Sequence, residues 1–99
     1  MKRYAVIPTR NRPGDLADSV AAIAPQVDLV IIVDNRSDPP VTTRDLPGAA
    51  RVVYCADDPP NLSVLWNLGY EVAAAYAGTE PYDMAFLNDD AVAPPGWFE

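Results

Sequence analysis

Asp28-Leu29-Val30-Ile31-Ile32-Val33-Asp34 contains five consecutive branched apolar residues between two carboxylates. A run of this kind is typical of a strand covered on both faces, as the central strands of parallel sheets are. Its carboxyl end leads into a polar loop that begins with Asp34 and Asn35. We therefore expect a parallel sheet with this strand near its centre.

The segments around this strand predict two helices. Pro13 suits the first turn of a helix, because its missing N–H costs nothing there, and Pro25 would end that helix. Asn61 can cap a second helix, which Gly78 is placed to end. Its apolar face follows three- and four-residue steps through Leu62, Leu65, Trp66, Gly69, Val72, Ala73 and Tyr76.

Three further short apolar runs predict strands. They are 4–8, 51–55 and 84–87, and the last, Met84-Ala85-Phe86-Leu87, is expected to be buried on both faces. Strands and helices then alternate along most of the chain, as in βαβ units. The expected fold class is α/β: one domain over residues 1–99, with a Rossmann-like parallel sheet of about four strands and helices on both faces.

Composition excludes several classes of function. The net charge is −7, whereas a nucleic-acid backbone or an anionic membrane surface requires a basic face. The chain has no histidine and one cysteine, Cys55, so an internal disulfide is impossible, a zinc site is improbable, and histidine-based catalysis is excluded. No segment resembles a signal peptide or the ~20 apolar residues of a membrane span, so a cytoplasmic location is expected.

Polar residues follow three of the expected strands. They are Thr9–Arg12, Asp34-Asn35 and Asn88–Asp90. Parallel strands end at one edge of the sheet, and ligands of open α/β sheets bind there. Adjacent carboxylates repel each other unless a cation lies between them, and hard divalent cations prefer oxygen ligands. The pattern predicts a metal-assisted site for a phosphorylated ligand; the alternative is that Asn88–Asp90 is a solvated turn.

Several segments together resemble a known family. In order, they are Ile7–Pro13, Val33–Asn35, Asn61 with Trp66–Gly69, Phe86–Asp90 and Ala93–Phe98. Their order and spacing are similar to those of family 2 glycosyltransferases of GT-A fold, and the resemblance covers essentially the whole chain. It implies the N-terminal half of such an enzyme, which binds a nucleotide-diphosphate sugar together with a divalent cation.

The resemblance also implies which residues bind the donor. Thr9, Asn11 and Asp34 match positions that hold the base and ribose. The full set of implied nucleotide-sugar-binding residues is Pro8, Thr9, Arg10, Asn11, Asp34, Asn35, Asn61, Asn88 and Asp89. The implied metal ligands are Asp90 and Asp89, for Mn²⁺ or Mg²⁺. Asn88 replaces the first carboxylate of the family's D-x-D motif, and its amide oxygen could still coordinate without adding charge.

Catalytic residues are not assigned, because the family's catalytic base and acceptor-binding half follow the part that these 99 residues match. The resemblance therefore implies an unknown acceptor and no sugar transfer by this chain alone. The alternative is a non-catalytic nucleotide-binding module, or a subunit or remnant that needs a partner chain. If exposed, Trp97 and Phe98 would suit a homodimer contact or the docking of a complementary C-terminal half.

Three other nucleotide or phosphate folds are disfavoured. A phosphoacceptor receiver domain needs acidic residues after its first strand and a late lysine, but this chain has Pro8-Thr9-Arg10 there, and its only lysine is Lys2. Neither a G-x-G-x-x-G motif after the first strand nor a Walker A motif is present. Arg10 and Arg12 could either be solvated or meet a ligand phosphate.

Overall fold

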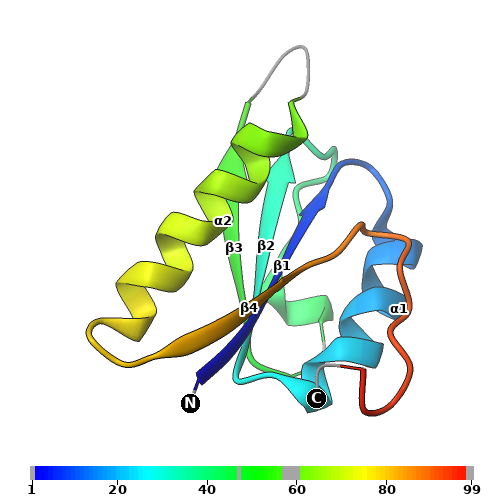
Figure 1. Cartoon of the computed structure of the whole chain (residues 1–99). Helices are drawn as coiled ribbons and strands as arrows, with labels where there is room; N and C mark the ends of the chain where they lie inside the picture. The colour runs from blue at the N-terminus through cyan, green and yellow to red at the C-terminus, as the bar shows by residue number, and fades with distance from the viewer. Residues whose placement is uncertain (1, 47, 57–60, 98–99) are drawn as a thin grey trace.

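The computed structural model describes residues 2–46, 48–56 and 61–97. Its strands form one sheet, parallel throughout, in the order β3-β2-β1-β4 (Figure 1). The elements are β1 (Lys2–Thr9), α1 (Pro13–Ile23), η1 (Ala24–Gln26), β2 (Leu29–Asn35), η2 (Thr43–Asp45), β3 (Ala50–Cys55), α2 (Leu62–Ala77) and β4 (Tyr82–Phe86). The predicted α/β class, with a Rossmann-like parallel sheet, is confirmed.

The two long helices cover opposite faces of the sheet, as Figure 1 shows. Ile32 of β2 belongs to the same buried cluster as Leu16 of α1, whereas its neighbour Ile31 belongs to the cluster of Leu65 of α2. Successive residues of a strand point to opposite faces, so each central strand contributes to both cores. The prediction of a doubly covered strand near the centre is therefore confirmed for β2.

The prediction for the last strand is wrong in one respect. In the described part of the chain β4 pairs only with β1 and forms an edge of the sheet. It begins at Tyr82, earlier than expected, and Phe86 is 41% exposed. Leu87 is buried but lies after the strand. An apolar run does not distinguish a central strand from an edge strand, because the position in the sheet depends on the other strands.

Both helices start and stop where the sequence predicts. Pro13 occupies the first turn of α1, and Pro25 lies in η1 after the helix has ended. Asn61 caps α2, and Gly78 ends it with a φ of 60°, a backbone conformation that glycine adopts without strain.

The apolar face of α2 is narrower than the sequence predicts. Its buried residues are Leu65, Gly69, Ala73 and Ala77. Leu62 and Tyr76, predicted to lie on this face, are largely exposed. The four buried residues recur at every fourth position from the first turn of α2 to its last, so a single narrow stripe of the helix packs on the sheet, and Leu62 and Tyr76 lie beside that stripe. No helix in the described residues is long and apolar enough to cross a membrane.

Candidate functional site

The strand order places a topological switch point between β1 and β4. The chain proceeds from β1 outward to β2 and β3, then returns to the other side of β1 to form β4. The loops after β1 and β4 therefore lie next to each other at the ends of two paired strands, although they are far apart in the chain. In open α/β sheets this arrangement creates a crevice beyond the strand ends, where ligands bind.

A cleft of about 390 Å³ lies at this switch point. Its volume falls within the ~300–1,000 Å³ range of ligand pockets. Seven of the predicted site residues line it, namely Pro8, Thr9, Arg10, Asn35, Asn88, Asp89 and Asp90. The other lining residues are Arg12, for which a phosphate contact was one of two alternatives, and Leu62 and Leu65, which were not predicted to bind a ligand.

A hydrogen bond joins the two sides of this cleft. The Thr9 hydroxyl donates to Oδ2 of Asp89 at 2.9 Å. Thr9 is only 5% exposed at the end of β1, so it holds the Asp89 carboxylate in place. Asp90 makes no such bond in the described residues, and its side chain is 59% exposed. One carboxylate is therefore fixed and the next is free to reorient.

Arg12 faces both carboxylates from the start of α1. Its Nη1 atom lies 3.7 Å from Oδ1 of Asp89 and 3.9 Å from Oδ2 of Asp90. The sequence contained one indication of this position. Arg12 directly precedes Pro13, the predicted start of a helix, so it had to lie at the end of the loop that follows the first strand. The sequence could not distinguish this contact from a solvated charge.

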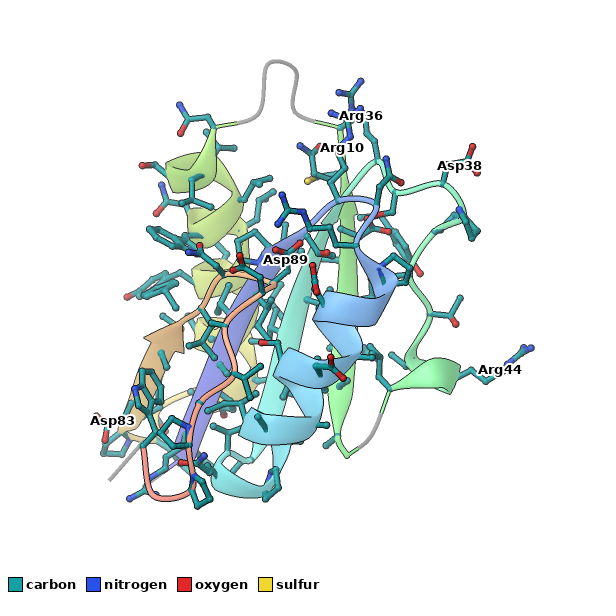
Figure 2. The ribbon with its side chains drawn as sticks, turned by 90° about the vertical axis from the view of Figure 1, so that its right-hand side faces the viewer. Arg10, Arg36, Asp38, Arg44, Asp83 and Asp89 are labelled. Atoms are coloured by element: carbon teal, nitrogen blue, oxygen red, sulfur yellow. The ribbon has the colours of Figure 1, made fainter. Side chains whose placement is uncertain are left out.

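Charged side chains of both signs gather at this edge of the sheet. Three of the seven Lys and Arg residues, Arg10, Arg12 and Arg36, lie in loops that follow β1 and β2. Figure 2 shows Arg10 and Arg36 beyond the end of the sheet and Asp89 beside the start of α1. The edge therefore presents cations and carboxylates together, which suits an anionic ligand bound with a metal ion.

Asp34 does not line the cleft. It is 1% exposed, and its two carboxylate oxygens accept the backbone N–H groups of Ser37 at 3.1 Å and Val41 at 2.9 Å. The side chain therefore shapes the loop after β2 from within. The contact with base or ribose that the resemblance implies stays a prediction.

Asn11 ties the loop after β1 to the loop after β2. Its side-chain oxygen accepts the N–H of Asp38 at 2.7 Å, and its own N–H donates to the Ser37 hydroxyl at 2.9 Å. Its φ of 55° is in the left-handed region, which asparagine tolerates better than most residues. Asn11 lines a second, largely apolar cleft of about 220 Å³ between α1 and the 37–46 loop, not the cleft at the switch point.

Asn61 also lies outside the lining of the switch-point cleft. Its side-chain oxygen accepts the N–H groups of Ser63 at 3.0 Å and Val64 at 3.4 Å. This satisfies two N–H groups that have no partner within the helix. Leu62 and Leu65, which follow on α2, line the cleft instead, so the helix that Asn61 caps contributes an apolar wall.

We expect Asn61→Ala to lower the free energy of unfolding by about 1 kcal/mol, because the cap is lost. Asn61→Ser should retain most of the stability, since serine also caps helices well. Urea unfolding of the three chains measures the effect. If Asn61→Ala were as stable as the parent chain but bound nucleotide less tightly, the side chain would be a ligand contact and not primarily a cap.

The remaining predictions concern metal and partner. The described residues contain no group of three or more His, Cys, Asp or Glu side chains that could hold a metal ion by themselves. Trp97 is 45% exposed, and Phe98 lies outside the described residues. Comparison of the chain with protein-family models, with curated proteins and with solved structures finds no match.

Proposed function

We propose that this chain binds a nucleoside-diphosphate sugar together with a divalent cation, as the donor-binding part of a glycosyltransferase. The ligand would occupy the cleft between the loops that follow β1 and β4. The observation that carries the proposal is the hydrogen bond between Thr9 and Asp89 at the switch point. It joins two of the motifs on which the family resemblance rests, within one cleft.

The chemistry of the cleft supports a ligand of this class. Its lining combines the cationic side chains of Arg10 and Arg12, which suit phosphate oxygens, with apolar side chains of Leu62 and Leu65. Such a mixture suits a ligand with a charged diphosphate and less polar sugar or base. A nucleic acid is less suitable, because the whole chain carries a net charge of −7.

The oxygen atoms of Asn88, Asp89 and Asp90 fit Mg²⁺ or Mn²⁺. Mg²⁺ is commonly held by one or two carboxylates together with oxygens of the substrate's phosphates, rather than by a complete protein cage. Two neighbouring carboxylates are therefore enough if the diphosphate supplies the other ligands. Bound there, the cation would neutralise charge on the diphosphate.

Calorimetric titration with UDP, GDP and dTDP, each with and without Mn²⁺, tests the proposal. We expect one nucleotide to bind in a Mn²⁺-dependent manner. Asp90→Asn should weaken that binding by about tenfold or more, because it removes a charged metal ligand. Asp90 is exposed, so the substitution should leave the stability unchanged.

Asp83→Asn is the matched control. Asp83 is an exposed carboxylate on β4 that is paired in the strand register with Arg3 near the start of β1, and Figure 2 shows it well away from Asp89. The Asp83→Asn substitution changes the net charge by the same amount as Asp90→Asn. The Asp83→Asn variant should nevertheless bind nucleotide as the parent chain does. The proposal is wrong if the folded chain binds none of the three nucleotides, and the metal role of Asp90 is wrong if both variants bind equally well.

A further inference from the structure

Arg12 combines a fixed backbone with an exposed side chain. It is the residue that precedes α1, and its carbonyl accepts the N–H of Leu16 at 2.9 Å. The backbone position is therefore set by the first turn of the helix. The side chain is 55% exposed and extends across the mouth of the cleft toward the loop after β4.

A single nitrogen of Arg12 faces two different carboxylates. Nη1 lies 3.7 Å from Asp89 and 3.9 Å from Asp90. Because Thr9 already holds the other oxygen of Asp89, the oxygen that faces Arg12 has a defined direction. A positive group between two adjacent carboxylates occupies the position that a bridging cation would take.

The contact is loose enough to be exchanged. Charge-assisted N–H···O bonds are typically about 2.7–2.9 Å long, and both distances here are considerably longer. Arg12 and Asp90 are both exposed, and ion pairs between exposed, solvent-screened side chains are weak. A divalent cation with an inner coordination shell can therefore displace the guanidinium from the carboxylates.

We propose that Arg12 is a built-in counter-ion that exchanges with the divalent cation. Without metal, Arg12 lies between Asp89 and Asp90 and offsets their mutual repulsion. When the cation occupies the carboxylates, like charge drives the guanidinium away, and it turns to the diphosphate within the same cleft. This inference rests on the proposed function, because it takes the metal and the diphosphate from it.

The exchange predicts effects of opposite sign for Arg12→Gln. Mn²⁺ alone should bind roughly three- to tenfold more tightly, because a competing positive charge about 4 Å away is removed. Inorganic pyrophosphate, titrated in saturating Mn²⁺, should bind about tenfold less tightly, because an arginine–phosphate contact is lost. If Arg12 had only a structural role, Arg12→Gln would weaken the binding of both Mn²⁺ and pyrophosphate.

Mn²⁺ binding is measured from the electron paramagnetic resonance signal of the free ion, and pyrophosphate binding by calorimetry. Arg12→Lys keeps the charge without the planar fork, so it should restore the parent Mn²⁺ affinity but only part of the pyrophosphate affinity. Arg44→Gln, which removes an exposed charge on η2 away from Asp89, should change neither (Figure 2).

The results separate this inference from the proposed function. If Arg12→Gln shifts Mn²⁺ and pyrophosphate affinity in opposite directions while no nucleotide binds, the counter-ion role holds and the nucleotide-sugar function falls. If a nucleotide binds with Mn²⁺ but Arg12→Gln leaves the Mn²⁺ affinity unchanged or lowers it, the counter-ion role is wrong. Absence of Mn²⁺ binding to either chain at millimolar concentration also overturns it.

Discussion

Gly69→Ala should lower the free energy of unfolding by about 2–4 kcal/mol, the cost of overpacking a core that cannot relax. A Cβ atom at position 69 would lie 2.2 Å from Cγ1 of Val6. The Cγ2 and Cβ atoms of Val6 would also be close, at 3.0 and 3.2 Å, and rotation of the Val6 side chain does not change the Cβ distance. Val6 is fully buried in β1, so α2 must move away from the sheet.

Urea unfolding measures this effect, and Gly14→Ala is its matched control. No atom lies within 4 Å of a Cβ built at Gly14, in the first turn of α1. The same substitution there should leave the stability unchanged or slightly raised, because alanine is the better helix former. A Gly69→Ala chain as stable as the Gly14→Ala chain would contradict the close packing of α2 on β1.

The double variant Gly69→Ala, Val6→Ala identifies the contact responsible. Val6→Ala alone should destabilise the chain by about 2 kcal/mol, since it removes buried methyl groups. In the double variant the new methyl group occupies the space that valine leaves. The combined loss should therefore be smaller than the sum of the single losses by at least about 1 kcal/mol. Additive losses would place the strain elsewhere.

Asp34→Ala should lower the free energy of unfolding by about 2–4 kcal/mol, because two backbone N–H groups lose their acceptor. These are the N–H groups of Ser37 and Val41, which bind different oxygens of the buried carboxylate. Asp34→Asn retains one acceptor oxygen and should lose about half as much. Thermal and urea unfolding of the three chains provide the comparison.

The Asp34 variants also discriminate between two roles for this side chain. If the carboxylate only shapes the loop, nucleotide affinity should fall in proportion to the loss of stability in the two variants. If it contacts the ligand, as the family resemblance implies, Asp34→Asn should abolish binding while it retains most of the stability. A stable Asp34→Ala chain would contradict the loop-shaping role.

Short sequence patterns were sufficient to predict the elements that are determined by residues close to one another in the chain. The run Leu29–Val33 predicted the central strand, and Asn61 and Gly78 predicted the ends of α2, because caps act within a few residues. The edge position of β4 could not be predicted in this way. Pairing order in a sheet depends on contacts between strands that are distant in the chain.

At the candidate site, too, some contacts could be predicted from the sequence and others could not. The resemblance grouped Thr9 with Asp89, and the structure brings them into contact. It also grouped Asp34 and Asn61 with the ligand, but their side chains bind backbone N–H groups of their own loops and helix. Asp and Asn serve equally well as ligand groups and as local acceptors, so residue type alone does not separate these roles. Arg12 was ambiguous because its contacts depend on the fold.

Among the described residues β4 pairs with β1 alone, so this one pairing holds the two walls of the cleft together. Thr9 and Asp89 are separated by 80 positions in the chain. Bringing them together closes a long loop and lowers the conformational entropy of the chain, and the pairing of β4 with β1 must offset this loss. In a molecule in which β4 has separated from β1, Thr9 and Arg12 remain in place but the carboxylates of Asp89 and Asp90 have left the cleft. The apparent affinity of a ligand that needs both sides is reduced by the fraction of such molecules. A ligand that contacts both loops in turn stabilises the sheet in which β4 is paired with β1. Ligand affinity and the stability of this strand pairing are therefore thermodynamically linked.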